Sequence, residues 1–259
     1  MSEWVASGMS VCVAFVGACC KIHCKLVIFN RLYQQLVETS IFEKITYKSL
    51  SRMSFTICKT IFISGSAYEY GRFGDNGRFF VRDLSKALLH NGFRIISGHG
   101  LGIGPAIIEG ALHEIYREAD RHFGDYLRIY PFPPTECPEG VWQHYRKDII
   151  SQAGIAIFLF GNKLEDISIR EADGMLKEFE IARTRGALLI PVGSSGYVSE
   201  KLWASVLSRY DDYFENREIY DLFQQLGDPS LEQEDLIRTI VAIAGSWASR
   251  PKEHRSPVG

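Results

Sequence analysis

The sequence lacks any marked excess of charge of one sign. Its 259 residues carry 29 Lys and Arg against 31 Asp and Glu, so the formal net charge at pH 7 is −2. A nucleic-acid-binding domain usually carries a basic excess that meets the phosphates, so the composition gives no reason to expect nucleic acid as a partner. The hydrophobic share of 46% is ordinary for a globular chain and supplies enough apolar residues for a sizeable core.

The six cysteines lack the spacing of a disulfide framework or of a zinc site. Four of them, from Cys12 to Cys24, fall within thirteen residues, whereas a disulfide-stabilised domain distributes them along the chain. Cys20, His23 and Cys24 are potential metal ligands, but no second Cys or His pair follows at the spacing that a structural zinc site needs. We therefore expect a reducing, cytoplasmic environment and neither a metal nor a cofactor.

The N-terminal segment lacks charge from Trp4 to Cys20 and lacks the basic start of a signal peptide. Seventeen residues are just enough to span a bilayer, and Lys21 and Lys25 would keep the following chain on the cytoplasmic side. The run is rich in small residues rather than Leu and Ile, so a buried piece of a larger, truncated domain is the alternative. Residues 1–59 are interpreted as this apolar segment followed by a connector.

From Thr60 onward, apolar runs alternate with amphipathic helical patterns, and no segment repeats. Strands are predicted over Thr60–Ser66, Phe93–Ser97, Tyr126–Tyr130, Gly154–Gly161 and Ala187–Gly193, and helices over Arg78–His90, after Pro105, up to Gly186, and over Lys201–Tyr213 and Leu231–Trp247. Apolar strands that alternate with helices indicate a parallel sheet covered on both faces. The predicted fold class is a Rossmann-like, doubly wound α/β domain over residues 60–215, followed by C-terminal helices and a polar tail over residues 216–259.

Two predicted strands end in small residues that suit a phosphate site. These residues are Ser64, Gly65 and Ser66 after the first strand, and Gly98, Gly100, Gly102 and Gly104 after the second, just before a helix. Ligands of such sheets bind beyond the carboxyl ends of the strands, where glycines allow close approach and a helix N-terminus attracts an anion. The spacing differs from the dinucleotide fingerprint, and a plain tight turn is the alternative. Two such strand ends in one fold favour a phosphate site.

Several short motifs follow one another between residues 60 and 210. They are FISGSA at Phe62–Ala67, SGHGLGIG at Ser97–Gly104, PFP at Pro131–Pro133, WQHYRKDI at Trp142–Ile149, GIAIFLFGN at Gly154–Asn162, and an acidic helix ahead of LIPVG at Leu189–Gly193. In this order they resemble the SLOG superfamily, and within it the C-terminal sensor domain of Thoeris anti-phage effectors. The resemblance implies a homo-oligomeric receptor for a cyclic ADP-ribose-type nucleotide made by a partner TIR-domain enzyme, with binding coupled to an effector.

Three charged residues acquire a role from this resemblance. The family's ligand-binding arginine, lysine and glutamate fall on Arg146, Lys163 and Glu178. The planar fork of an arginine suits a pyrophosphate, a lysine supplies a point charge, and a glutamate accepts hydrogen bonds from ribose hydroxyls. Glu180 is the competing candidate for the role of Glu178, because residues two apart on a helix lie on different faces.

The LOG phosphoribohydrolases of the same superfamily supply an alternative function, the hydrolysis of a nucleoside monophosphate. Those enzymes carry a Pro-Gly-Gly turn and then a Gly-Thr-x-x-Glu helix start. Here Phe160-Gly161-Asn162-Lys163 and an acidic insertion precede Gly174-Met175-Leu176-Lys177-Glu178. The missing turn and threonine favour a binding module without catalytic residues.

The segment ahead of the predicted sheet is also shorter than the effector domain that the resemblance implies. Fifty-nine residues cannot hold a sirtuin domain. The sequence therefore predicts either a sensor tethered to the membrane through residues 4–20 or a remnant of a longer protein.

Overall fold

The computed structural model describes residues 57–117, 122–132, 138–214 and 217–249, all within one compact unit that extends from Phe55 to Gly259. The predicted membrane segment at residues 4–20 and the cysteine cluster around Cys20 lie outside the described residues, so their interpretation stays a prediction. Among the helices that are described, none is both long enough and apolar enough to cross a membrane.

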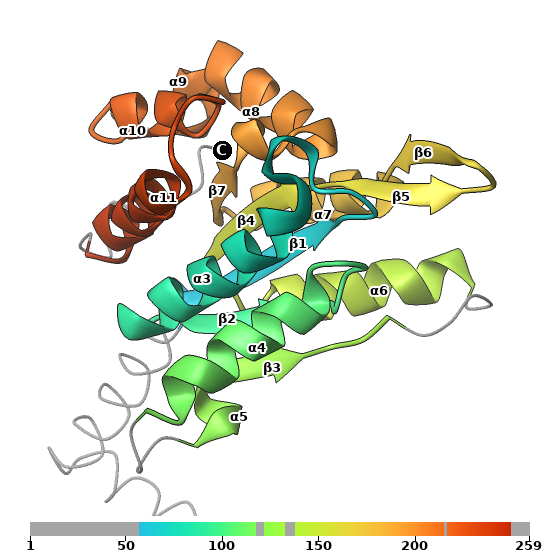
Figure 1. Cartoon of the computed structure of the whole chain (residues 1–259), viewed down its shortest axis with the longest axis horizontal. Coiled ribbons are helices and arrows are strands. Elements are labelled where there is room, and N and C mark those ends of the chain that lie inside the picture. Colours follow the sequence, from blue (N-terminus) through green and yellow to red (C-terminus); the bar gives the residue numbers. More distant parts are fainter. Residues whose placement is uncertain (1–56, 118–121, 133–137, 215–216, 250–259) are drawn as a thin grey trace, which may run out of the picture. The chain divides into compact units, whose positions relative to one another are not determined.

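A five-stranded parallel sheet with the order β3-β2-β1-β4-β7 forms the centre of the domain (Figure 1). Its strands are β1 (Thr60–Ser66), β2 (Arg94–Ser97), β3 (Leu127–Ile129), β4 (Ile155–Phe160) and β7 (Leu188–Pro191). Each lies within a strand predicted from the sequence. The chain builds outward from β1 to β3, then returns to the other side of β1 with β4 and β7. This reversal confirms the doubly wound, Rossmann-like fold class and places the topological switch point between β1 and β4.

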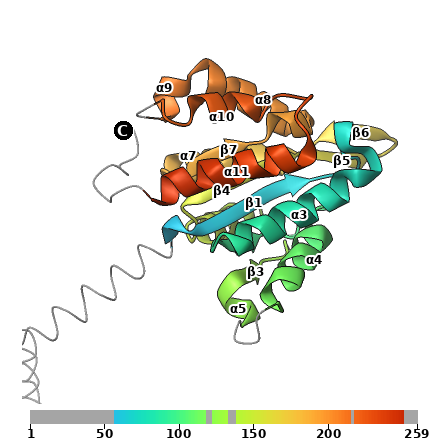
Figure 2. The same ribbon diagram turned by 60° about the vertical axis from the view of Figure 1, so that its left-hand side comes forward.

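Helices cover both faces of this sheet (Figures 1 and 2). One face carries α3 (Gly77–His90), α4 (Gly104–Ile115) and α11 (Gln233–Ala248), and the other carries α6 (Glu139–Ile150) and α7 (Asp173–Thr184). The short α5 (Phe123–Tyr126) precedes β3. Two 3-10 turns, η1 (Gly71–Asn76) and η2 (Gly193–Ser195), follow β1 and β7 respectively. Three further helices lie together next to β7: α8 (Tyr197–Ser208), α9 (Tyr210–Tyr213) and α10 (Tyr220–Gln225).

One predicted helix, Lys201–Tyr213, is divided in the structure. Its first part, α8, begins earlier, at Tyr197, directly after Gly196 with φ of 81°. It ends at Ser208 because Arg209 leaves the helical region, with φ of −130° and ψ of 39°. The spacing of apolar residues continues across Arg209, so the sequence pattern predicts one uninterrupted helix and gives no sign of the break.

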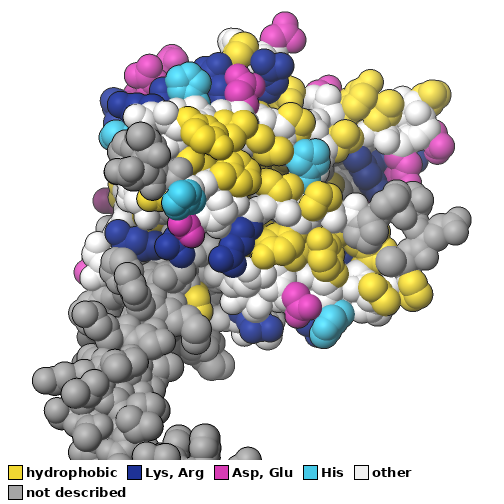
Figure 3. All heavy atoms as spheres, turned by 90° about the horizontal axis from the view of Figure 1, so that it is seen from below, with side chains coloured by type: hydrophobic (Ala, Val, Ile, Leu, Met, Phe, Trp, Pro, Cys, Tyr) yellow, Lys and Arg dark blue, Asp and Glu magenta, His cyan; other side chains and the backbone are white. Residues whose placement is uncertain are grey.

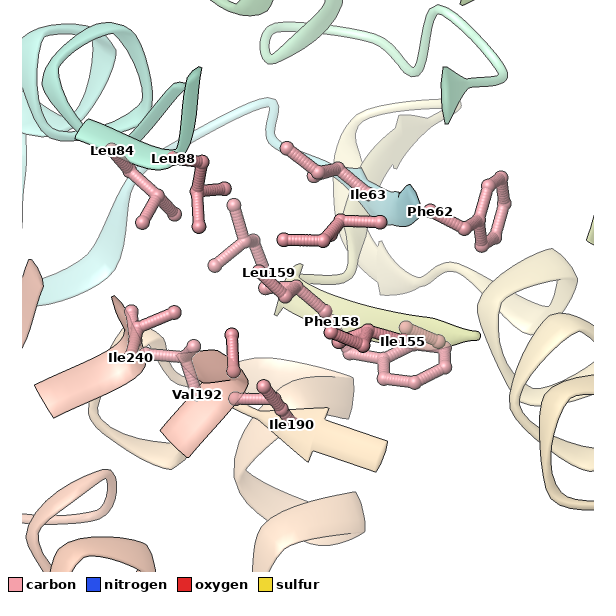
Figure 4. Packing of buried hydrophobic residues seen from close by; sticks show 14 of the residues in the cluster. Phe62, Ile63, Leu84, Leu88, Ile155, Phe158, Leu159, Ile190, Val192 and Ile240 are labelled. Atoms are coloured by element: carbon pink, nitrogen blue, oxygen red, sulfur yellow. The ribbon is translucent and has the colours of Figure 1, made fainter. Parts of the chain in front are cut away.

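The hydrophobic core has one layer on each side of the sheet. Leu84 of α3 and Ile240 of α11 lie on the side of β4 that Leu159 faces (Figure 4). On the other side, Phe158 meets Phe179 of α7 edge to face, with ring centroids 5.3 Å apart. Every residue of β4 is buried, as expected for the central strand of a parallel sheet.

A separate antiparallel hairpin leaves the main sheet after β4. It consists of β5 (Asn162–Glu165) and β6 (Ser168–Glu171), joined by the two residues Asp166 and Ile167. Asp166 has φ of 56°, a conformation that Asp tolerates better than most residues in tight hairpin turns. The sequence analysis treats this stretch as an acidic insertion and predicts no strand in it.

One face of the domain carries side chains of both charges. On the face seen from below in Figure 1, basic side chains are interspersed with acidic, histidine and hydrophobic ones over the described residues (Figure 3). The large hydrophobic residues with the greatest exposure, Ile167, Tyr116 and Leu101, lie on different elements of the chain. Scattered exposed apolar residues of this kind are normal on a globular domain.

The C-terminal helix α11 is packed into the same core as the sheet. Ile240 is fully buried. Ahead of the helix, the guanidinium of Arg72 donates to the carbonyl oxygens of Pro229 and Leu231 over 2.7 and 3.0 Å, and to that of Ser194 over 3.1 Å. Arg72 therefore joins the segment after β1 to the chain that leads into α11.

We expect Ile240→Ala to lower the free energy of unfolding by about 2–5 kcal/mol, because it opens a cavity between α11 and the sheet. Arg238→Ala, on the exposed side of the same helix, is the control and should change it by less than about 1 kcal/mol. Urea unfolding followed by circular dichroism measures both. Equal stability of the two variants would show that α11 contributes little to the core.

Candidate functional site

The glycine-rich loop after β2 packs directly against the end of β1. A Cβ on Gly100 would lie 1.9 Å from the carbonyl oxygen of Gly65, and a Cβ on Gly102 would lie 1.9 Å from that of Ala67. Gly102 also has φ of +75°, which a residue with a side chain adopts only at a cost. Backbone-to-backbone packing thus requires glycine at both positions, which is a structural reason of the kind that the tight-turn alternative implies.

The remaining predicted glycines are also in close contact with other segments. A Cβ on Gly65 would lie 2.3 Å from the carbonyl oxygen of Leu159, and one on Gly98 would lie 2.5 Å from the ring of Phe132. Gly104 is the first residue of α4. The ends of β1, β2 and β4 therefore meet at one place, beside the switch point where ligands of this fold bind.

A buried polar chain joins three of the predicted site residues. The hydroxyl of Ser64 donates to Oε2 of Glu178 over 2.6 Å, and Nε of Arg146 lies 3.5 Å from Oε1 of the same carboxyl group. The side chains of Arg146 and Glu178 are only 13% and 10% exposed. β1, α6 and α7 each supply one member, so the fold brings together residues that lie far apart in the sequence.

Burial raises the pKa of Glu178, and this effect outweighs the hydrogen bond from Ser64 and the charge of Arg146, both of which lower it. Glu180, the competing candidate, lies on the exposed side of α7, where Oε2 pairs with Arg183 at 2.8 Å. The structure thus confirms that the two glutamates occupy different faces of the helix, and only Glu178 reaches the strand ends.

Two polar atoms at this place are buried without a hydrogen-bond partner. They are the hydroxyl oxygen of Ser66, at the end of β1, and Nε of Arg146, whose contact with Glu178 is an ion pair without hydrogen-bond geometry. Buried polar groups nearly always have a partner, because losing water without replacement is costly. These two atoms are therefore candidates to bind a ligand.

Aromatic rings surround the guanidinium of Arg146. Its carbon atom Cζ lies 5.2 Å from the centroid of Phe132 and 5.3 Å from that of Trp142. These two rings are stacked at 5.1 Å, and Tyr145 meets Phe132 edge to face. Cation–π attraction and packing hold the arginine in one orientation. The motifs PFP and WQHYRKDI, which supply these rings, therefore position Arg146.

Lys163 lies on β5, outside the buried chain. Its Nζ is 3.3 Å from Oδ1 of Asp173 and 3.6 Å from Oε2 of Glu165. Asp173 begins α7, and the next residue, Gly174, lies against Arg146, since a Cβ there would be 3.2 Å from Nη2. Lys163 and Arg146 thus flank the first turn of α7.

The sequence analysis did not assign a role to Asn162. This fully buried side chain accepts hydrogen bonds from the N–H groups of Tyr68 and Glu69 over 2.8 and 3.1 Å, and donates to the carbonyl oxygen of Glu69 over 2.9 Å. Nearby, the hydroxyl of Tyr70 donates to the carbonyl oxygen of Gly102 over 2.9 Å. Both contacts fix the loop after β1. The place of Asn162 at the end of the GIAIFLFGN motif is the feature of the sequence from which this role could have been inferred.

The chain belongs to the Sir2- and TIR-associating SLOG family, STALD, whose profile matches residues 43–246. This confirms the resemblance drawn from the ordered motifs.

Similar curated proteins are NAD(+) hydrolases ThsA from three bacteria. That of Cytobacillus dafuensis is 38% identical over 210 residues, which cover 76% of this chain and 42% of the relative. That of Bacillus cereus strain MSX-D12 is 33% identical over 231 residues, which cover 88% and 46%. That of Acinetobacter baumannii strain 532279 is 40% identical over 197 residues, which cover 71% and 41%. The chain thus spans less than half the length of these relatives.

A similar solved structure is the X-ray structure of a structural-genomics target, TM1055. It is 14% identical, and the match covers 56% of this chain and 81% of the other chain. The TM-score is 0.40, which is too low to bear on function.

We expect Gly102→Ala to reduce the free energy of unfolding by at least about 2 kcal/mol, because the added Cβ meets the Ala67 carbonyl and the positive φ disfavours a side chain. Gly245→Ala, in α11 with open space around it, is the control and should be neutral or stabilising by up to about 1 kcal/mol. Thermal melts compare them. A Gly102→Ala variant as stable as the parent protein would mean that the loop relaxes and that its close packing is dispensable.

A pH dependence follows from Glu178. Because its pKa is higher in the folded protein than in the unfolded chain, its contribution to stability is fully present below the ordinary value of 4.5 and is lost as the pH rises through the folded pKa. Relative to Glu178→Gln, the parent protein should therefore lose stability as the pH increases above 4.5. Urea unfolding at a series of pH values measures the difference, with Glu180→Gln as the exposed control. A difference that grows in favour of the parent protein with increasing pH would contradict the shift.

Proposed function

We propose that this domain is a sensor that binds a cyclic ADP-ribose-type nucleotide and that binding controls an effector in bacterial anti-phage defence. The observation that carries the proposal is the buried chain of Ser64, Glu178 and Arg146 at the switch point, together with the unpartnered atoms of Ser66 and Arg146. Convergent polar groups at the switch point of an α/β sheet, some of them without a partner, are typical of a ligand site.

The side chains fit the parts of such a nucleotide. Arg146 and Lys163 flank the start of α7, where two cations and a helix N-terminus favour a pyrophosphate. The carboxylate of Glu178 uses each oxygen once within the protein and retains acceptor capacity for a ribose hydroxyl. The aromatic rings around Arg146 keep its guanidinium in place before the ligand arrives.

Family membership supports the source of the signal. The family is described as associating with Sir2 and TIR domains, which agrees with a nucleotide supplied by a TIR-domain enzyme. The NAD(+) hydrolase activity belongs to the longer relatives. For this chain we propose the regulatory part of such a system, in the cytoplasm. A homo-oligomeric state and a tether through residues 4–20 remain predictions.

The alternative function, hydrolysis of a nucleoside monophosphate, has less support in the site. Met175 stands where the LOG enzymes carry a threonine hydroxyl, and its side chain is buried. Incubation of the protein with AMP separates the two functions. Steady release of adenine would favour the hydrolase, whereas tight calorimetric binding of a cyclic ADP-ribose isomer without adenine release would favour the sensor.

Lys163→Ala is expected to weaken binding of the cyclic ADP-ribose isomer by ten-fold or more, because a charge-assisted hydrogen bond contributes about 1.5–3 kcal/mol. The melting temperature should not fall, because the partners of Lys163 within the described part of the chain are exposed acids. Arg146→Lys keeps the charge but loses the fork, and should also weaken binding. It is preferable to Arg146→Ala, which would leave Glu178 buried without its partner.

Lys147→Ala is the matched control. This residue adjoins Arg146 on α6 but lines the outer groove between α6 and α7, together with Leu176. Isothermal titration calorimetry should give the parent affinity for this variant. If Lys163→Ala and Arg146→Lys also retain the parent affinity, the site assignment is wrong.

A further inference from the structure

The β5–β6 hairpin presents two cations side by side. Its register places Arg170 directly opposite Lys163, so both side chains lie on the same face of the hairpin. Like charges in directly opposed positions destabilise a two-stranded sheet. Among the described residues, Arg170 makes no ion pair, and it is exposed. Lys163 pairs with Glu165 on the same face and with Asp173, whereas Arg170 is left without such a partner in the described part of the chain and is available to an anionic group of a ligand.

The face that carries these cations is turned toward the start of α7. Lys163 reaches Asp173, the first residue of that helix. The opposite face carries the cross-strand pair Leu164 and Ile169, with Glu171 beside them paired to a lysine of α8. The two faces thus have different neighbours, and the cationic face is the one next to the candidate site.

The start of α7 also connects this face to Arg146. Asp173 pairs with Lys163, and Gly174, the next residue in the chain, lies against Nη2 of Arg146. The free N–H groups in the first turn of a helix add a partial positive charge. Lys163 pairs with Asp173, Arg146 lies against the next residue, and Arg170 is the cross-strand neighbour of Lys163, so the first turn of α7 lies close to several cationic groups. The pKa of Asp173 is lowered, because the hydrogen bond and charge of Lys163 outweigh the effect of partial burial, which alone would raise it.

We propose that Arg170 is a further ligand-binding residue, which together with Lys163 clamps the phosphate groups of the nucleotide between the hairpin and the first turn of α7. The inference rests on the proposed function. The fork of Arg170 contacts phosphate oxygens, and the phosphate replaces the Asp173 carboxylate as the partner of Lys163. Asp173 therefore competes with the ligand, and the hairpin is a binding element rather than a spacer.

Titration calorimetry with a cyclic ADP-ribose isomer, and separately with inorganic pyrophosphate, tests this clamp. Arg170→Ala should lower the affinity for both probes about ten-fold, and Arg170→Lys should recover part of the lost affinity. Asp173→Asn should bind both probes more tightly than the parent protein. Arg185→Ala, an exposed arginine just after α7, is the control and should leave both affinities unchanged.

The outcomes separate the clamp from the proposed function. If the parent protein binds the nucleotide, Lys163→Ala binds it weakly and Arg170→Ala binds it normally, the clamp is overturned and the sensor function stands. If Arg170→Ala weakens pyrophosphate but the parent protein binds no cyclic ADP-ribose isomer, the clamp stands and the nucleotide assignment fails. If the parent protein binds neither probe, both are overturned.

Discussion

The site depends on the direct contact between the backbones of three strand ends. The loop after β2 can approach β1 because Gly100 and Gly102 have no side chains, and β1 can approach β4 because Gly65 has none. These contacts, rather than any long side chain, set the position of Ser64 relative to the helices that follow β3 and β4. Close packing of this kind tolerates little adjustment, so the polar groups at the switch point are held at fixed separations before any ligand binds.

The pair of Glu178 and Arg146 is difficult to explain as a stabilising element. Removing two charges from water is expensive, and the attraction within a buried ion pair, here with 3.5 Å between Nε and Oε1, often does not offset that loss. The atom Nε of Arg146 also remains without a hydrogen bond. Replacing such a pair with well-packed apolar side chains is often neutral or stabilising. Its presence at the switch point, with aromatic rings that orient the arginine, is better explained by a function that requires these charges.

Much of the fold could be predicted from the sequence, because its strands are largely buried and therefore appear as short runs that are mostly apolar. Phe93–Ser97 and Gly154–Gly161 are examples that the structure reproduces. The hairpin was missed because its strands are short and exposed: Lys163, Arg170 and Glu171 give no hydrophobic pattern from which a strand is inferred. The break after Ser208 was missed because a backbone change at Arg209 leaves the apolar spacing intact.

The site was predictable in its residue types but not in its contacts. Family resemblance pointed to Arg146, Lys163 and Glu178, and helical periodicity separated Glu178 from Glu180. Nothing in the sequence shows that Ser64 donates to Glu178, since the two residues meet only when α7 folds back onto β1. The role of the glycines was also hidden, because a glycine that admits a phosphate and one that admits another backbone look alike in a sequence.

The hairpin is also structurally independent of the main sheet. Its base is closed by a hydrogen bond from the N–H of Ala172 to the carbonyl oxygen of Gly161, and its two strands form a sheet of their own. Residues added or lost at the turn would lengthen or shorten the hairpin without shifting β4 or the start of α7. The tip can therefore change in length and composition while the packing of the main sheet beneath it stays the same.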